Sequence, residues 1–397
     1  MKIKNQNLFT KNYLFILLIN LFAYLGFYLL VPTLPAYAKQ IGGSSLEASL
    51  VVSGFSLTSL IFRFFAGDLC TIIGKRLLIA LGLAILAFST LFYIFMPIQG
   101  IIAFRFIQGM GWGISSTTIA TVVSEIVPAE RRGEGMGYYS LSMIISMSIS
   151  PVVAIMVMNT YKFNAIAMAS ISFIFIAILS LLGLKIPKSI IKPSKKRKIK
   201  LSDLIEKKAV FPSFLCLLLS VTLCGIMSYI MLYGKEVKIN IIWIYFIGHV
   251  VAILITRPFV GKIFDKVGHS VVILPGAICM IIGLVLLSFV HSVFLLIIAS
   301  IFYGLGYGAV QPSLQTWAVN RSPAHRKGAA NGTFLSSLDL GFTFGSIILS
   351  FVAEAKSYAF MYRFSALFMV LFLFIYGGYL IKNNNQSVDI QFTEEAM

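Results

Sequence analysis

Long apolar stretches separated by short polar segments run along the whole chain. Twelve of these stretches, each of roughly 20 residues, are long enough to cross ~30 Å of hydrocarbon as α-helices. They are apolar throughout and do not alternate with period two, which excludes membrane-spanning strands. The predicted spans lie near 13–36, 47–66, 77–97, 100–124, 136–158, 164–185, 211–233, 240–261, 270–290, 293–317, 332–353 and 359–381.

Composition supports this pattern. The chain is 58% hydrophobic and only 12% charged, with a mean hydropathy of +0.92. A soluble protein of 397 residues needs far more polar surface to cover its core. The fold class is therefore predicted to be an all-α membrane protein with twelve transmembrane helices.

The basic residues predict the orientation of these helices. Most of the 32 Lys and Arg residues fall in segments on the same side as the N-terminus, and that side is usually cytoplasmic. We therefore expect a multi-pass protein of the cell membrane with both termini in the cytoplasm. Since the basic residues are scattered over loops, the net charge of +18 does not indicate a nucleic-acid partner. The basic run 195–198 is suited to contact with anionic membrane lipid.

The second half of the chain repeats the first. Pro128-Ala129-Glu130-Arg131-Arg132-Gly133 returns 195 residues later as Pro323-Ala324-His325-Arg326-Lys327-Gly328. Arg63, Gly67 and Gly74 are echoed 194 residues later by Arg257, Gly261 and Gly268. Such repeats predict two six-helix bundles related by a pseudo-twofold axis, with a site where they meet. The expected units are bundles at 1–186 and 211–382, a basic cytoplasmic linker at 187–210 and a cytoplasmic tail at 383–397.

The segment Gly-Lys-Ile-Phe-Asp-Lys-Val-Gly-His at 261–269 carries the most specific motif. It resembles the loop signature G-x-x-x-D-[RK]-x-G-[RK] of the major facilitator superfamily. The first-half copy at 67–76 is degraded, because Thr71 and Ile72 stand where the family has an acid and a base. Asp68, one helical turn earlier, is a hypothetical substitute for that acid. The resemblance covers nearly the full length and implies a transporter that opens to each side of the membrane in turn.

The same resemblance implies charged residues that hold one conformation closed. The loop residues and the arginines around them are suited to pairing with charges or helix ends of the opposite bundle. The predicted gating residues are Arg63, Asp68, Arg257, Asp265, Lys266, Arg131, Arg132 and Arg326.

Two further helices resemble family signatures. Arg105-Phe106-Ile107-Gln108-Gly109-Met110-Gly111 is similar to R-x-x-Q-G-x-G of the fourth helix, which implies a part for Arg105 in proton coupling. The alternative is an arginine bonded permanently to backbone carbonyls. Ser146–Pro151 with Ala154 is a degraded form of the antiporter signature of the fifth helix. Together these elements look like the twelve-helix bacterial drug:proton antiporters.

Titratable groups inside predicted spans are the candidates for proton coupling. Asp339 leads them, because burial raises and a nearby cation lowers the pKa of a carboxyl, so one acid can load and release a proton. A structural Asp bonded to neighbouring backbone is the alternative. His249 is the second candidate, although a lone His on an apolar helix is more often a packing residue. Arg105 is the third.

Aromatic and polar residues on the spans expected to line the centre are the candidates for substrate binding. Large aromatic walls with few fixed polar groups suit lipophilic or amphipathic molecules. The candidates are Asn20, Tyr24, Phe27, Tyr28, Gln108, Trp112, Ser116, Tyr229, Tyr233, Gln311, Gln315 and Ser336.

The sequence contains no P-loop, H-E-x-x-H motif or nucleophile with an evident base, so we expect neither an enzyme nor an ATP-driven pump, and neither a cofactor nor a metal site. The predicted function is export of amphipathic or lipophilic small molecules in exchange for protons, by a monomer. The alternative is a dedicated transporter of one solute, such as a metallophore, sugar or lipid precursor, working as a symporter. A sensor that binds without transporting is a third class.

Overall fold

A computed structural model describes residues 8–128, 131–185, 205–323 and 326–395 of the chain. Within these ranges some side chains lie outside the description, and among them are Asp68, Thr71, Arg132, Glu134, Lys262, Asp265, Lys327 and those after residue 382.

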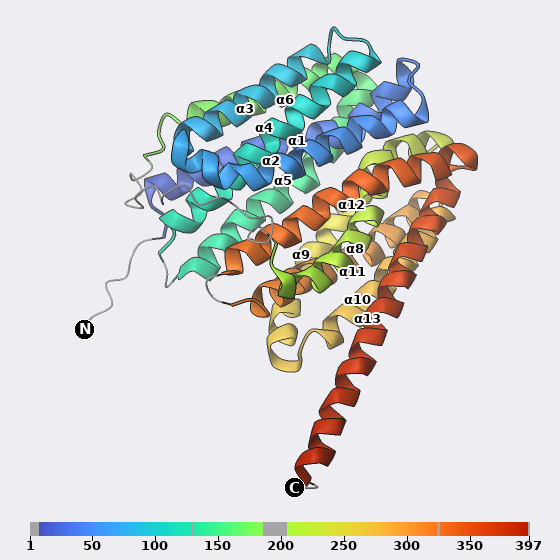
Figure 1. The fold of residues 1–397 in the computed structure, drawn as a ribbon. Coiled ribbons are helices and arrows are strands. Elements are labelled where there is room, and N and C mark those ends of the chain that lie inside the picture. The colour runs from blue at the N-terminus through green and yellow to red at the C-terminus, as the bar shows by residue number, and fades with distance from the viewer. Residues whose placement is uncertain (1–7, 129–130, 186–204, 324–325, 396–397) are drawn as a thin grey trace.

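The first half of the described chain forms six long helices that pack into one bundle. Figure 1 shows them together in one half of the molecule. They are α1 (Lys11–Gln40), α2 (Ser45–Ile72), α3 (Lys75–Phe92), α4 (Ile98–Ile126), α5 (Arg132–Thr160) and α6 (Phe163–Ser180).

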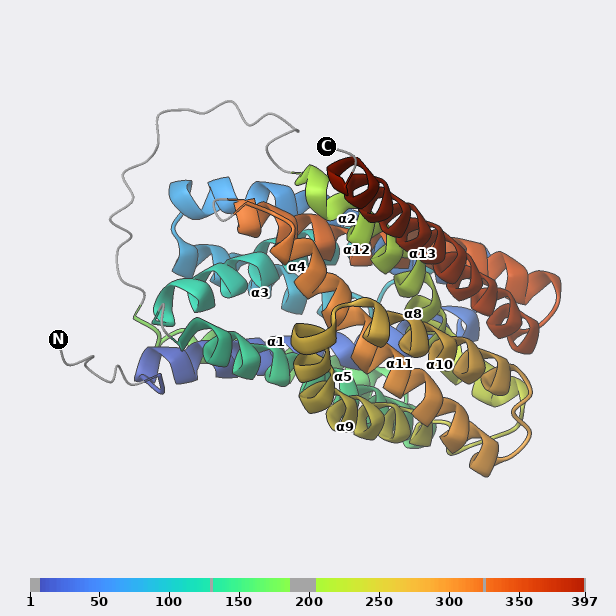
Figure 2. The same cartoon turned by 90° about the horizontal axis from the view of Figure 1, so that it is seen from below.

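The second half forms the other bundle. A short 3-10 turn, η2 (Lys207–Ala209), leads into it. Its helices are α8 (Val210–Glu236), α9 (Ile244–Val267), α10 (Ser270–Ser288), α11 (Val293–Asn320), α12 (Lys327–Ala355) and α13 (Tyr358–Glu395). Figures 1 and 2 show α12 of this bundle lying beside α2 of the other. The all-α fold with twelve helices in two bundles is confirmed.

Eleven helices of the described residues are long and apolar enough to span a membrane by themselves. The remaining long helix, α4, has 29 residues but carries Arg105, Gln108 and a run of Ser and Thr, which make it more polar. Because its Arg105 and Gln108 side chains are buried inside the bundle, α4 crosses as an inner helix of the group.

Local sequence explains where the helices begin and turn. Ser44 accepts a hydrogen bond from the backbone N–H of Glu47, and the Glu47 carboxylate accepts one from the N–H of Ser44, which forms a capping box at the start of α2. Gly74 and Gly268 have φ of 89° and 99° and stand in equivalent turns after α2 and α9. Only glycine adopts this left-handed backbone easily, so the repeated glycines produce the same sharp turn twice.

The repeat also governs packing inside each bundle. A Cβ atom added at Gly109 would lie 2.2 Å from the carbonyl oxygen of Phe55 on α2. At Gly304, the equivalent residue of the second half, it would lie 2.4 Å from the carbonyl oxygen of His249 on α9. Both helix pairs therefore approach too closely for any side chain, as small-residue contacts between membrane helices allow.

The two bundles meet along α1, α2 and α5 on one side and α8, α12 and α9 on the other. We call the end of the molecule that holds Lys11 and Ile72 the terminal end, and the end that holds Gln40 and Ser45 the distal end. At the distal end Ser350 Oγ donates a hydrogen bond of 2.7 Å to the carbonyl of Ser45.

Apolar side chains strengthen this closure. Val31, Ala36 and Ile155 of the first bundle are buried in the same cluster as the core of the second. The Asn159 amide donates to the carbonyl of Asn240 at 3.4 Å. The bundles are therefore packed together at the distal end.

Two segments differ from the sequence-based expectation. The predicted eighth span begins at 240, but Lys238 has φ 57° and residues 240–243 form a turn, so α9 starts at Ile244. No Gly or Pro follows Gly378, and α13 continues as a helix to Glu395 instead of ending near 381.

Candidate functional site

An ion pair connects α2 of the first bundle to α12 of the second. Arg63 on α2 donates from Nη2 and Nε to Oδ2 of Asp339 on α12, at 2.9 and 3.1 Å. Both side chains are largely buried, with 13% and 18% of their surfaces exposed. Ser59 Oγ, one helical turn before Arg63, lies 3.4 Å from the same oxygen. The structure thus brings together a predicted gating residue and the leading proton-site candidate.

The other side of the Arg63 guanidinium faces α4. Its Nη1 lies 3.4 Å from both Ser116 Oγ and Thr117 Oγ1. Ser116, a predicted substrate residue, also donates to the carbonyl of Trp112 at 2.7 Å. Arg63 therefore links α2, α4 and α12, and any change in the charge of Asp339 acts on three helices at once.

Tyrosines surround this pair. Tyr24 and Tyr28 on α1 are buried or half-buried and interact electrostatically with Asp339. Tyr139 on α5 interacts with the Tyr24 hydroxyl and with Arg63. The sequence did not single out Tyr139, Ser59 or Thr117. Ser59 could have been identified because it lies one helical turn from Arg63. Nothing in the sequence links Tyr139, which is on another helix, to Arg63.

Next to the ion pair lies a cluster of four predicted substrate residues. Phe27 stacks on Trp112 with ring centroids 4.4 Å apart, and Tyr24 meets the same indole edge-on at 4.7 Å. The Tyr28 ring lies 5.1 Å from Phe27, and Phe55 stacks on Phe27 at 5.0 Å. We call Tyr24, Phe27, Tyr28, Phe55 and Trp112 the aromatic cluster. It forms one wall of the region between α1, α2 and α4.

Arg105 is enclosed within the first bundle. Its Nε donates to the carbonyl of Val51 at 2.6 Å, and its Nη1 donates to Gln108 Oε1 at 2.6 Å. Its guanidinium carbon lies 4.3 Å from the centre of the Phe55 ring, and only 3% of the residue is exposed. The Gln108 side chain is also bonded to Thr90. Arg105 and Gln108 thus form a satisfied polar core between α2, α3 and α4.

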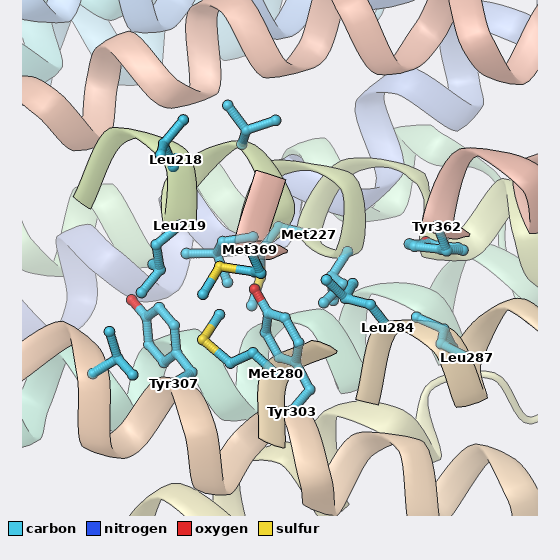
Figure 3. Packing of buried hydrophobic residues seen from close by; sticks show 14 of the residues in the cluster. Leu218, Leu219, Met227, Met280, Leu284, Leu287, Tyr303, Tyr307, Tyr362 and Met369 are labelled. Atoms are coloured by element: carbon cyan, nitrogen blue, oxygen red, sulfur yellow. The ribbon is translucent and has the colours of Figure 1, made fainter. Parts of the chain in front are cut away.

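His249 on α9 of the second bundle is the repeat equivalent of Phe55 on α2. It is fully buried, and among the described residues neither ring nitrogen has a hydrogen-bond partner. The rings of Tyr245, Tyr303 and Tyr307 lie 5.6–6.0 Å from its imidazole. Figure 3 shows Tyr303 and Tyr307 pointing from α11 toward α8, and Thr222 on α8 shares a 2.8 Å hydrogen bond with Tyr303.

Tyr229 and Tyr233 are packed inside the second bundle. Their hydroxyls donate to the carbonyls of Ser346 and Leu287, at 2.7 and 2.6 Å. Both residues are at most 1% exposed. The structure therefore separates these two tyrosines from the aromatic cluster of the first bundle.

Two of the remaining polar candidates form hydrogen bonds between neighbouring helices. Gln315 on α11 donates to Asn331 on α12 at 2.7 Å, and Gln311 lies 3.5 Å from Gln315. Asn20 on α1 donates to Ser142 on α5 at 2.7 Å. Ser336 Oγ on α12 is buried and has no partner among the described residues.

The predicted gating loops are described only in part. The side chains of Asp68, Asp265 and Arg132 lie outside the described residues, so the structure gives no geometry for a latch there. Lys266 is exposed at the end of α9, and Arg131 stands at the N-cap of α5.

Arg326 at the start of α12 binds a residue that precedes α8. It forms an ion pair with Glu206, and its Nη2 donates to the carbonyl of Ile205 at 3.0 Å. The Glu206 carboxylate also accepts from the backbone N–H of Lys208 at 3.2 Å. The Arg326 hydrogen bond holds the pKa of Glu206 below its usual range. Arg326 therefore fastens the end of the segment between the bundles to the second bundle.

This pair predicts a pH-dependent stability. A carboxyl with a lowered folded-state pKa stabilises the fold above its unfolded pKa of ~4.3, and that contribution is lost as the pH falls through the folded value. We expect Arg326→Gln to lower the thermal unfolding temperature by several degrees at pH 7 and to have little effect near pH 3. Thermal unfolding in detergent measures both values. Arg321→Gln removes an exposed charge nearby and serves as the control, and an equal loss at both pH values contradicts the assignment.

A shallow cavity lies elsewhere, at the distal end. It is lined by Ile155, Asn159, Met231, Lys235 and their neighbours and contains none of the predicted substrate residues.

Curated proteins of similar sequence are transporters. An uncharacterized MFS-type transporter of Methanocaldococcus jannaschii is 28% identical over 87% of this chain and 92% of its own length. The staphylopine export protein of Staphylococcus aureus is 21% identical over 86% of this chain and 89% of its own. The quinolone resistance protein NorA of the same species is 23% identical, with 84% and 88% covered.

Solved structures show the same fold. The D-xylose–proton symporter superimposes with a TM-score of 0.72 over 91% of this chain and 97% of its own, at 16% identity. The sequence profile of the Major Facilitator Superfamily matches residues 16–253 and 238–395, which together cover nearly the whole chain. The chain therefore belongs to the Major Facilitator Superfamily, and it is a multi-pass membrane transporter of a small molecule, not an enzyme.

Proposed function

We propose that this transporter exports amphipathic or lipophilic small molecules in exchange for protons, by alternating access between the two bundles. The observation that supports the proposal best is the ion pair of Arg63 and Asp339, because it joins the two bundles through a group that can take up a proton. An acid inside the membrane is costly and is a functional candidate for that reason.

The proton acts on the contact between α2 and α12. When Asp339 is ionised, its Oδ2 accepts hydrogen bonds from both Nε and Nη2 of Arg63. Protonation removes the negative charge and one acceptor site, so the attraction between the two helices weakens. The ionised acid thus stabilises the arrangement in which the distal end is closed, and the protonated acid favours its opening.

With both termini in the cytoplasm, the distal end faces outward. Protons from outside then reach Asp339 when the bundles are open on that side, and they leave it toward the cytoplasm. The inward flow of protons supplies the free energy for outward movement of the substrate.

The aromatic cluster supplies the binding surface in this proposal. Phe27 and Trp112 offer stacking faces, while the hydroxyls of Tyr24 and Ser116 lie close to the charged pair. Such a wall favours molecules with a flat apolar body and one polar group. The relative NorA is a quinolone resistance protein, which is consistent with cargo of this kind.

Arg105 and His249 have structural roles in this proposal. The described partners of Arg105 are the Val51 carbonyl, the Gln108 amide oxygen, the Phe55 ring and the Tyr93 hydroxyl, all inside its own bundle. His249 is enclosed by tyrosines and fully buried, so a proton has no described path to it. Asp339 is therefore proposed as the proton carrier.

A dedicated transporter of one physiological solute is the second candidate, and the staphylopine export protein among the relatives favours it. A symporter would carry protons and solute the same way.

The test is transport driven by a pH gradient in proteoliposomes. We expect an acidic lumen to drive uptake of norfloxacin, a fluorescent quinolone, above the level in protein-free liposomes. Each pH unit is worth ~1.4 kcal/mol per proton, which supports an accumulation of about tenfold if one proton is exchanged. Uptake that requires an alkaline lumen would indicate symport. Uptake that does not depend on the pH gradient would contradict proton coupling.

A further inference from the structure

Arg63, Arg105 and Arg257 lie well inside helices that cross the membrane, and the first two have an acid or oxygen partners beside them. Arg63 pairs with Asp339, and Arg105 donates to two oxygens at 2.6 Å. Arg257 on α9 is the third. Its Nε is buried, and among the described residues it has no hydrogen-bond partner and no acid beside it. A guanidinium at this depth is expensive to keep unless something supplies the opposite charge.

The internal repeat explains why this arginine lacks an acid. Arg257 is the second-half equivalent of Arg63, 194 residues later, and α9 packs against α5 just as α2 packs against α12. By the offset of 195 residues that relates α5 to α12, the equivalent of Asp339 is Ile144. Ile144 is 8% exposed and belongs to the same buried cluster as Tyr307 of the second bundle. The chain thus retains both arginines of the repeat but only one of the two acids.

Arg257 lies near the contact between the bundles. Its guanidinium is close to the hydroxyl of Tyr307 on α11. Tyr307 belongs to the buried cluster that includes Ile144 of α5, and Phe27 and Tyr28 of α1 pack against that cluster. This chain of neighbours places the unneutralised cation across from the aromatic cluster.

We propose that Arg257 binds an anionic group of the transported molecule, a carboxylate or a similar oxyanion, while its apolar body lies against Tyr28 and the aromatic cluster. The inference rests on the proposed transport function and narrows its substrate class. A carboxylate is a good partner because it accepts two parallel N–H bonds from one guanidinium. The substrate then supplies the charge that the isoleucine at position 144 does not.

The test compares two probes that differ only in charge. Dansylglycine carries a carboxylate, and dansylglycinamide is its neutral equivalent. Equilibrium binding to the purified full-length transporter is measured by dansyl fluorescence in the absence of any pH gradient. We expect the wild type to bind the anion at least ~10-fold more tightly than the amide, since charge-assisted bonds of this kind are the strong ones.

Variants test the role of the guanidinium. Arg257→Gln is expected to abolish the preference for the anion while leaving the affinity for the amide unchanged. Arg257→Lys keeps the positive charge but lacks the two parallel N–H donors of the guanidinium, so it should retain part of the preference for the anion. Arg321→Gln removes an exposed arginine elsewhere and should retain all of it. Thermal unfolding of each variant shows whether the fold is intact.

Several outcomes would overturn the proposal. In the first, the wild type binds both probes with equal affinity. In the second, Arg257→Gln loses affinity for both probes equally. In the third, Arg257→Lys is folded but has lost the preference for the anion as completely as Arg257→Gln. Displacement of dansylglycine by phosphatidylglycerol added to phosphatidylcholine nanodiscs would assign the charge to a lipid headgroup instead. Because binding is measured without a gradient, absence of proton-driven norfloxacin uptake would count against the transport mechanism and leave anion binding standing.

Discussion

Asp339→Asn is expected to abolish accumulation against a gradient while preserving passive exchange. The asparagine has nearly the same shape, and its amide oxygen can still accept a hydrogen bond from Arg63, so it imitates the protonated acid. It cannot take up a proton. In proteoliposomes with a gradient of ~2 pH units, the wild type should approach ~100-fold accumulation of norfloxacin, and the variant should stop at equal concentrations on both sides.

Exchange of labelled for unlabelled norfloxacin without a gradient shows whether the variant still transports. Glu354→Gln is a matched control, since it removes an exposed acid from the same helix α12, and it should behave as the wild type. Asp339→Glu should retain coupling in part. An Asp339→Asn variant that accumulates norfloxacin as the wild type does would remove Asp339 from the coupling mechanism.

Arg105→Ala is expected to destabilise the protein by ~2–5 kcal/mol without changing coupling in the molecules that fold. The substitution leaves Gln108 Oε1 with one donor fewer, removes the bond to the Val51 carbonyl and opens a cavity beside Phe55. All of these contacts lie inside the first bundle. Thermal unfolding in detergent measures the loss, and the accumulation ratio of norfloxacin per folded protein measures the coupling.

Arg363→Ala provides the comparison. Arg363 is exposed at the start of α13, where it donates to Ser288 at 3.2 Å and lies over the ring of Phe289. Surface contacts of this kind contribute about 0–1 kcal/mol. If Arg105→Ala leaves the unfolding temperature unchanged but lowers the accumulation ratio, Arg105 belongs to the coupling machinery after all.

The helices could be predicted from the sequence because the physical signal for them is local. A run of apolar residues long enough to span the membrane can be recognised directly in the sequence. The repeated Arg, Gly and Pro residues likewise show that the two halves are related. The helix ends were harder to predict where caps and turns determine the boundary, as at Ile244 and beyond residue 381. There the backbone of Lys238 and the lack of a helix-breaking residue after Gly378 settled the boundaries.

The site was predictable residue by residue but not as an arrangement. Arg63 and Asp339 both stood out as charges within apolar helices, yet the sequence assigned them separate roles, because their contact spans 276 residues and depends on how the bundles meet. Tyr229 and Tyr233 stood out equally, but which face of a helix points to the centre is decided by its neighbours. The missing acid opposite Arg257 became informative only when the repeat was combined with the packing of α9 on α5.

The most direct test of the account is the lumenal pH during substrate entry. Proteoliposomes loaded with the pH indicator pyranine, without any initial gradient, receive norfloxacin on the outside. The account predicts that the lumen becomes more alkaline as norfloxacin enters the wild type, and that it stays constant with Asp339→Asn. A lumen that becomes more acidic, or one that responds equally in both proteins, would contradict it.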